Sequence, residues 1–227
     1  MAVSIDKVYQ RVLAIANKEQ RGYITPLEFN LLANQAQMII FEQYFYDLDQ
    51  YMRSDGSAEE YSDIVHNIQE KIAFFEVQQS IHPSGTLPPD SFYRLGTVIY
   101  NHVTEVEEVQ QNEILYMNKS LLIKPSTRKP VYVRTSATII TPYPSSISSN
   151  LSCTYTRKPN KPSWGYVVVN TRAMYDADIT TDFELHPAEE SELVYKILKF
   201  AGLAIKRDDL AKGGQGLESL QVQQEKQ

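Results

Sequence analysis

Residues 17–29, NKEQRGYITPLEF, are the stretch whose residue types and spacing come nearest to a metal-binding loop. In the frame of an EF-hand calcium loop, Asn17 takes position 1, Gly22 the sharp turn and Glu28 the closing position 12. Such a loop binds Ca²⁺ through oxygen ligands at positions 1, 3 and 5. Position 5 is Arg21, whose positive charge would repel the ion. We therefore expect no calcium site, and a calcium-binding module is only an alternative function.

Helix termini explain the same stretch without a metal. Gly22 is suited to end a helix that begins near Ser4. Thr25 is a preferred N-cap residue, Pro26 fits the first helical position, and Glu28 can complete a capping box. We therefore expect one helix to end and the next to begin within these residues.

A second candidate is HPAEE at residues 186–190, where His186 and Glu189 form a His-x-x-Glu pair. Zinc sites of this kind have a second histidine one turn away, and that place is taken by Glu190. Proline and acidic residues in a first turn are typical of a helix start. We favour the helix start, and a metal-dependent hydrolase that uses His186 and Glu189 stays as an alternative.

The other groups that could do chemistry are scattered along the chain. His66, His82 and His102 lie in unrelated segments, and Cys153 lies on the apolar side of an expected strand, as a small core residue would. The sequence has no glycine-rich phosphate loop, no nucleophile elbow and no cysteine or histidine pairs at zinc spacing. We expect no catalytic, cofactor-binding or metal-binding residues, and hence no enzyme.

The composition is that of an ordinary globular chain. It has 227 residues, 42% of them hydrophobic, and a net charge of −6, which disfavours a general attraction to nucleic acid or to an anionic membrane. A single cysteine, no apolar leader and no long apolar run predict a reducing, cytoplasmic setting without a membrane span. Two basic turns, 126–130 and 156–162, could contact a partner or simply be solvated.

Apolar spacing predicts helices and strands in separate parts of the chain. Helices are expected at 4–20, 25–51, 58–72, 111–119 and 186–202. The second has apolar residues almost all round, which indicates burial on several sides or a partner. Short runs typical of strands are expected at 92–100, 103–109, 131–134, 138–143, 151–156 and 165–170. The first two and the next two are expected to form hairpins, and the alternation in 151–156 predicts a half-buried strand.

These elements predict an α+β fold. The helices of an N-terminal part, 1–87, and a C-terminal helix in 186–210 are expected to form a helical bundle. A small antiparallel β-sheet domain with a short helix, 88–185, is inserted between them. Residues 211–227 are a glycine-hinged, extended C-terminal tail with too few apolar residues for a core.

Several stretches resemble a known family. LPPDSFYRLGTVIYN, EVEEVQQNEILYMNKS, and RKPVYVR with the following IITPYPSSISSNLSCTYTRKPNKPSWGYVVVN resemble the core of head-to-tail adaptor proteins of short-tailed phages, the tail tubular protein A-like or connector ring proteins. NKEQRGYITPLEFNLLANQAQ and TTDFELHPAEESELVYKILKFAGLAIKRDDLA resemble segments of virion proteins of crAss-like podoviruses and their relatives.

The resemblance implies a structural virion protein in the neck or tail, assembled in the host cytoplasm. The partners it implies are copies of the chain in a dodecameric ring, the portal protein above, other tail ring proteins, and genomic DNA that passes through the channel without specific binding. Another tail ring or a capsid-internal virion protein is the nearest alternative.

Two groups of apolar residues are the expected partner-binding residues. Tyr44, Phe45 and Tyr46 are consecutive on a helix, so they point in different directions and cannot all face one small core. In the tail, Leu217, Leu220 and Val222 are too few to form a core and too apolar for a solvated linker. We expect at least one of the aromatic residues to contact a neighbouring subunit, and the tail to dock either on a neighbouring subunit or on the ring above.

Overall fold

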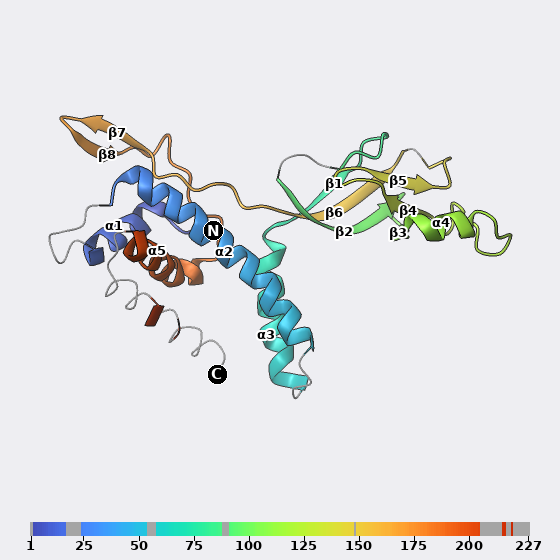
Figure 1. Ribbon diagram of the computed structural model, residues 1–227, viewed down its shortest axis with the longest axis horizontal. Coiled ribbons are helices and arrows are strands. Elements are labelled where there is room, and N and C mark those ends of the chain that lie inside the picture. The colour runs from blue at the N-terminus through green and yellow to red at the C-terminus, as the bar shows by residue number, and fades with distance from the viewer. Residues whose placement is uncertain are drawn as a thin grey trace. The chain divides into compact units, whose positions relative to one another are not determined.

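A computed structural model describes residues 2–16, 24–53, 58–87, 91–147, 149–204, 215–216 and 219 (Figure 1). The chain divides into two compact units. Unit 1 combines Met1–Lys71 with Pro159–Gln227, and unit 2 is Ile72–Lys158. The α+β class predicted from the sequence is confirmed, with helices concentrated in unit 1 and the main sheet in unit 2.

Unit 1 is built on helices whose apolar faces meet. They are α1 (Ile5–Ala16), α2 (Pro26–Arg53), α3 (Ala58–Ala73), the short 3₁₀ helix η2 (Pro187–Glu189) and α5 (Glu190–Ala204). Helix α5 packs against both α1 and α2. The fully buried side chains of this unit come from segments far apart in the sequence, and they include Ile5, Phe29, Phe41, Phe183, Leu185, Leu193 and Ile197. Described residues from the N-terminal part and from the stretch 183–197 therefore share one core, as the predicted helical bundle requires.

Helix α1 is fixed in this core by an aromatic cluster. The ring of Tyr9 lies 4.6 Å from that of Phe29 and 4.4 Å from that of Trp164, measured between centroids. The indole nitrogen of Trp164 donates to the Asp6 carboxylate at 2.9 Å, so its polar edge is satisfied while its rings are buried.

Helix α2 begins with the capping box expected from the sequence. The Thr25 amide donates to Glu28 Oε2 at 2.9 Å, and the Glu28 amide donates to Thr25 Oγ1 at 3.3 Å. The hydrogen bond from the Thr25 backbone lowers the pKa of Glu28 below its ordinary value. Glu28 thus holds a helix terminus, while residues 17–23 of the calcium frame lie outside the described residues.

Unit 2 holds a six-stranded sheet in the order β1-β6-β2-β3-β4-β5. The strands are β1 (Glu76–Ser80), β2 (Phe92–Tyr100), β3 (Thr104–Glu108), β4 (Val131–Arg134), β5 (Ile140–Tyr143) and β6 (Leu151–Arg157), and α4 (Gln111–Met117) lies between β3 and β4 in sequence. Neighbouring strands are antiparallel except for β3 and β4, which are parallel. The hairpins β2–β3 and β4–β5 are those predicted from the sequence.

One glycine adapts the sheet to an irregularity. The register between β2 and β6 shifts between Leu95 and Val98. A Cβ atom on Gly96 would lie 2.8 Å from the backbone oxygen of Thr154 in β6, closer than side chains normally approach. Glycine at this bulge lets the two strands stay in contact.

A separate two-stranded hairpin belongs to unit 1. It consists of β7 (Tyr166–Val169) and β8 (Arg172–Tyr175). The two residues between the strands, Asn170 and Thr171, both have positive φ angles, 48° and 64°, as a type I′ turn requires. The base of the hairpin is held by Trp164, whose ring centroid lies 5.8 Å from that of Tyr166.

Two features of the sheet differ from the sequence prediction. The sheet unit spans Ile72–Lys158 rather than 88–185, because β1 joins its edge and the hairpin β7–β8 belongs to unit 1. Strand β6 was predicted to be half-buried, yet Ser152 and Thr156 are buried as well as Leu151, Cys153 and Tyr155. The reason is its position, since β6 has a paired strand on each side.

Candidate functional site

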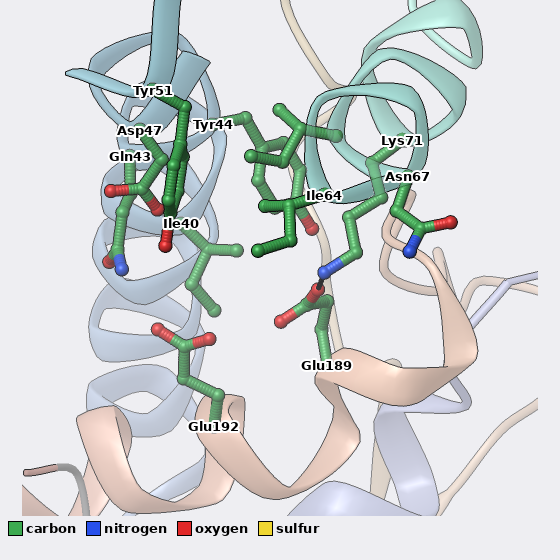
Figure 2. Close-up of a pocket in the computed structure, with 11 residues that line it drawn as sticks. Ile40, Gln43, Tyr44, Asp47, Tyr51, Ile64, Asn67, Lys71, Glu189 and Glu192 are labelled. Atoms are coloured by element: carbon green, nitrogen blue, oxygen red, sulfur yellow. Dashed lines mark ion pairs between the residues drawn. The ribbon is translucent and has the colours of Figure 1, made fainter. Parts of the chain in front are cut away.

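A cavity of unit 1 lies between α2, α3 and the segment where η2 passes into α5 (Figure 2). Its volume is about 220 Å³. Helix α2 contributes Ile40, Gln43, Tyr44, Asp47 and Tyr51, α3 contributes Ile64, Asn67, Ile68 and Lys71, and η2 and α5 contribute Glu189 and Glu192. The cavity thus combines aromatic and aliphatic side chains of α2 and α3 with polar groups from all sides, among them the carboxylates of Asp47, Glu189 and Glu192.

Helical spacing brings these side chains to one place. Ile40 and Tyr44 are four residues apart on α2, and Ile64, Ile68 and Lys71 follow one another by four and three residues on α3. Residues at these spacings lie on the same face of a helix. The facing surfaces of α2 and α3 therefore both carry apolar residues. On α3 the row ends at Lys71.

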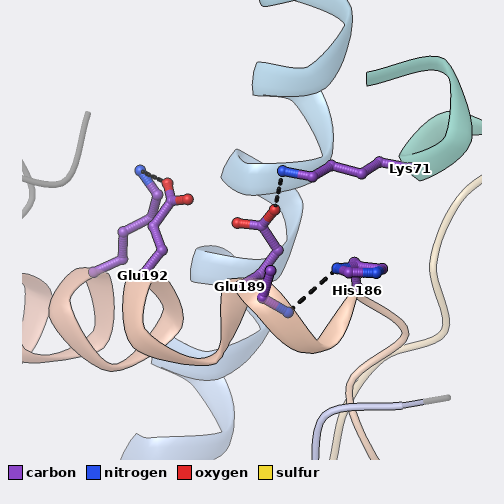
Figure 3. A network of polar contacts seen from close by, with 6 residues as sticks. Lys71, His186, Glu189 and Glu192 are labelled. Atoms are coloured by element: carbon purple, nitrogen blue, oxygen red, sulfur yellow. Dashed lines mark hydrogen bonds and ion pairs between the residues drawn. The ribbon is translucent and has the colours of Figure 1, made fainter. Parts of the chain in front are cut away.

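Glu189 is the most buried acidic side chain at the cavity, with 2% of its surface exposed. The Lys71 ammonium lies 2.6 Å from its Oε1 atom (Figure 3). The same ammonium lies 5.5 Å from the centroid of the Tyr44 ring, within the range of a cation–π contact. A lysine on α3 is thus bound at once to η2 and to α2.

Glu192 forms a second buried pair, with Lys196 one turn further along α5. The lysine nitrogen lies 3.0 Å from Glu192 Oε1 and donates to Gln43 Oε1 of α2 at 3.3 Å. The pKa of Glu192 is raised to about 7, mainly by burial and also by hydrogen bonding with Glu189, while Lys196 acts in the opposite direction. The Glu192 carboxyl therefore gains or loses its proton close to neutral pH.

The arrangement is suited to holding helices together in a proton-dependent way. Two carboxyl groups and two ammonium groups from three helices share one interior, where unpaired charges are strongly disfavoured. A carboxyl group that titrates near pH 7 can also transfer protons in catalysis. Here, however, Glu189 binds Lys71 and Glu192 binds Lys196, so their contacts are structural. We call these four residues the clamp.

His186 takes the structural role favoured from the sequence. It is the N-cap of η2, and its Nδ1 atom accepts a hydrogen bond from the Ala188 amide at 3.3 Å (Figure 3). The next acidic residue, Glu190, pairs with Arg11 at 2.7 Å, while Glu189 binds Lys71. Among the described residues, no cluster of three or more histidine, cysteine or acidic side chains is placed to hold a metal ion.

Cys153 is a core residue, as expected. It is fully buried in the cluster of apolar side chains that includes Val98 and Tyr155. Burial raises the pKa of its thiol to about 11, so the thiol stays protonated at neutral pH and is a poor nucleophile.

The structure separates the three consecutive aromatic residues of α2. Tyr44 is buried and lines the cavity, and Phe45 is half-buried with its ring 5.2 Å from that of Phe41. Tyr46 is 69% exposed, so of the three it is the one whose ring a partner can cover. Contact of Tyr46 with a partner stays a prediction, and Leu217, Leu220 and Val222 lie outside the described residues.

Sequence reasoning missed the lysines of the cavity. Lys196 is buried and Lys71 has only about a quarter of its side chain exposed, although lysine is normally a surface residue. The spacing of Glu192 and Lys196, one helical turn apart beside the buried Leu193 and Ile197, is the signal that could have indicated a buried pair.

Comparisons with known proteins give no family for this chain. No protein-family model matches the sequence, and no curated protein matches it. A search of the helices in the described residues finds none with both the length and the apolar character needed to cross a bilayer.

Proposed function

We propose that this chain is a structural virion protein, a head-to-tail connector ring that docks below the portal and extends the DNA channel into the tail. The resemblance of its sequence to connector ring proteins of short-tailed phages supports the proposal. Its partners are copies of itself in a dodecameric ring, the portal protein, other tail ring proteins and the DNA that passes through the channel. Its place is the neck or tail of the virion.

The observation that carries the proposal is the apolar surface of the hairpin β7–β8. Val168 is 63% exposed and Met174 is 58% exposed, and Val167, Val169 and Tyr175 are exposed as well. These side chains lie on both strands, so the hairpin offers apolar groups over most of its length.

Such a hairpin is a poor structure for a protein that acts alone. An isolated two-stranded sheet is marginally stable in water, and its outer strands leave backbone groups that another chain can pair with. Exposed apolar clusters on soluble proteins mark interaction sites. The hairpin is therefore suited to a subunit whose neighbours complete its surface.

The charge of the chain agrees with a passage for DNA. A net charge of −6 opposes the release of counterions through which proteins bind the phosphate backbone. A channel wall has to let DNA slide through, so weak attraction is an advantage in this role.

The test is assembly on the portal. The chain is mixed with the portal protein of the same virus and imaged by negative-stain electron microscopy. We expect an additional ring at the tail-side end of the portal, and we expect Val168→Asp to prevent it while leaving the melting temperature unchanged. The matched control is Thr171→Asp in the turn of the same hairpin, which should assemble normally.

Two results would contradict the proposal. The first is a purified chain that never binds the portal at any concentration. The second comes from the copy number and position of the chain in the intact virion. A chain found inside the capsid, or in a tail ring without portal contact, would support the nearest alternatives instead.

A further inference from the structure

Unit 2 carries an apolar knob, which we define as the exposed residues Leu115, Tyr116, Leu121, Leu122 and Ile123 at and after the end of α4. Leu121 and Leu122 are almost entirely exposed, and they are consecutive with Ile123. Burial of such side chains is favourable because it removes apolar surface from water. Three adjacent aliphatic side chains in water are therefore a strong indication of a surface that a partner covers.

Hydrogen bonds tie the loop of the knob to itself and to α4. The Ser120 hydroxyl oxygen accepts hydrogen bonds from the amides of Leu122 and Ile123, at 3.3 and 3.4 Å. The Ser120 amide in turn donates to the Met117 carbonyl at 3.2 Å, which ties the loop to the last turn of α4. The backbone that carries the aliphatic side chains is thus held by hydrogen bonds before any partner arrives, which lowers the backbone entropy lost on binding.

The surroundings of the knob are positively charged. Residues 115–129 contain no aspartate or glutamate. They contain the exposed basic residues Lys119, Lys124, Arg128 and Lys129. A surface that fits the knob should therefore combine an exposed aromatic or aliphatic centre with negative charge around it.

The exposed face of α2 in unit 1 has this character. Glu42, Tyr46 and Asp49 are exposed and follow one another by four and three residues, so they lie in one row on the helix. Beside Tyr46 is a hollow of about 320 Å³ lined by Tyr46, Asp49, Gln50 and Arg53. Arg53 ends the row with a positive charge, and the acidic residues outnumber it.

We propose that the knob of one copy of this chain docks on the Tyr46 face of α2 in the next copy. The aliphatic side chains of Leu121 and Leu122 cover the Tyr46 ring, and Lys119 and Lys124 face Glu42 and Asp49. The inference rests on the proposed function, because a ring needs two different complementary surfaces on every subunit. It deepens that function by assigning both surfaces.

The test is site-specific disulfide cross-linking between copies. The one native cysteine is first replaced, as Cys153→Ala, so that only introduced cysteines react. A tagged Leu122→Cys chain is mixed with an untagged Tyr46→Cys chain under mild oxidation, at high concentration and on the portal. We expect a disulfide-linked heterodimer in several-fold higher yield than with Val103→Cys, an equally exposed control residue of unit 2. A yield equal to that control overturns the proposal.

A second measurement tests the charges without cysteines. Lys124→Glu should lower self-association several-fold, as measured by sedimentation velocity, and Asp49→Lys in the same chain should restore part of it. Glu105→Lys, at an exposed acidic residue of β3, is the control and should restore nothing. Equal recovery with both changes would show a general effect of net charge and would contradict the assigned contact.

The remaining outcomes separate this contact from other occupants and from the proposed function. Flotation with vesicles of phosphatidylglycerol and phosphatidylcholine, lost on Leu122→Asp, would make the knob a membrane contact and overturn the proposal. Rings on the portal without the 46–122 cross-link would overturn it and leave the connector function intact. The cross-link without any portal binding would establish the contact and refute the connector function.

Discussion

The Lys71 ammonium lies 2.6 Å from the Glu189 carboxylate, which joins α3 to the start of the C-terminal helical segment within unit 1. The two residues come from the two separate stretches of sequence that form unit 1, and both face the cavity beside Tyr44. Apolar packing alone would let these two segments slide along one another. The ion pair fixes how they are aligned.

Removing one partner of this pair should destabilise the protein. Lys71→Met leaves the Glu189 carboxylate buried without its counter-charge, and the loss of one partner of a buried pair costs about 3 kcal/mol. Glu70→Gln on the same helix, in an exposed pair with His66, is the control and should change little. Urea unfolding measures both. If Lys71→Met and Glu70→Gln lower the free energy of unfolding equally, the clamp is not structural.

Glu192 should make stability depend on pH. Its pKa is about 7 in the folded protein and about 4.5, the ordinary value for glutamate, when unfolded. The folded state therefore binds this proton more tightly than the unfolded state does. The resulting contribution to the free energy of unfolding is complete below pH 4.5 and is lost as pH rises through 7. We expect the melting temperature of the native protein to fall relative to that of Glu192→Gln over this range. Parallel curves for the two proteins would refute the assignment.

The start of α2 should respond to its cap and not to calcium. Thr25→Ala removes the hydroxyl that accepts from the Glu28 amide, and the loss of such a cap costs about 1 kcal/mol. Millimolar calcium should leave the melting temperature of the native protein unchanged. A rise of several degrees that disappears in Glu28→Gln would instead show that the stretch binds the ion.

The consecutive aromatic residues of α2 should divide by function. Tyr44→Ala opens space in the interior and should cost about 3 kcal/mol, as loss of a large buried side chain does. Tyr46→Ala should leave stability nearly unchanged and weaken assembly, as loss of an interface hot spot does. Thermal melting and ring formation on the portal separate the two. Equal losses of stability for both variants would remove Tyr46 from the interface.

The C-terminal tail is expected to act in assembly and not in folding. A chain truncated after Ala211 loses Leu217, Leu220 and Val222, which are too few to form a core. The truncated chain should melt within about one degree of the full chain, since terminal segments seldom contribute to core stability. It should fail to enter connectors on the portal. Normal incorporation would show that the tail has no partner.

Local signals in the sequence predicted the elements whose stability is local. The capping box of Thr25 and Glu28, the hairpins β2–β3 and β4–β5, and the helix start within residues 186–190 follow from neighbouring residues. Strand β1 was missed because its sequence, EVQQS, is polar and largely exposed at the edge of the sheet. It is a strand because β6 offers it hydrogen bonds, and a pattern within one segment does not reveal that.

The clamp and the knob lie beyond local signals for different reasons. Lys71 is drawn into the interior by Glu189 of η2, and only the fold brings α3 and η2 together. Lys196 pairs with Glu192 on its own helix, but its burial depends on the packing of α5 against α2. Leu121 and Leu122 are apolar residues that a sequence pattern would bury, and the turn after α4 leaves them exposed. In both cases the tertiary arrangement overrides the usual preference, which is exposure for lysine and burial for leucine.

The pairing of β1 with β6 makes unit 2 a separable module. Glu76 pairs with Thr156, and the Arg157 amide donates to the Phe75 carbonyl at 2.9 Å, so the chain enters and leaves the unit on neighbouring strands. A single in-frame exchange of codons 72–158 would therefore replace the whole sheet without cutting a strand pair. We expect residues 72–158 expressed alone to give a dispersed amide spectrum by nuclear magnetic resonance. Such an exchange would carry the knob with the sheet and would take only the last two residues of α3 from the helices of unit 1.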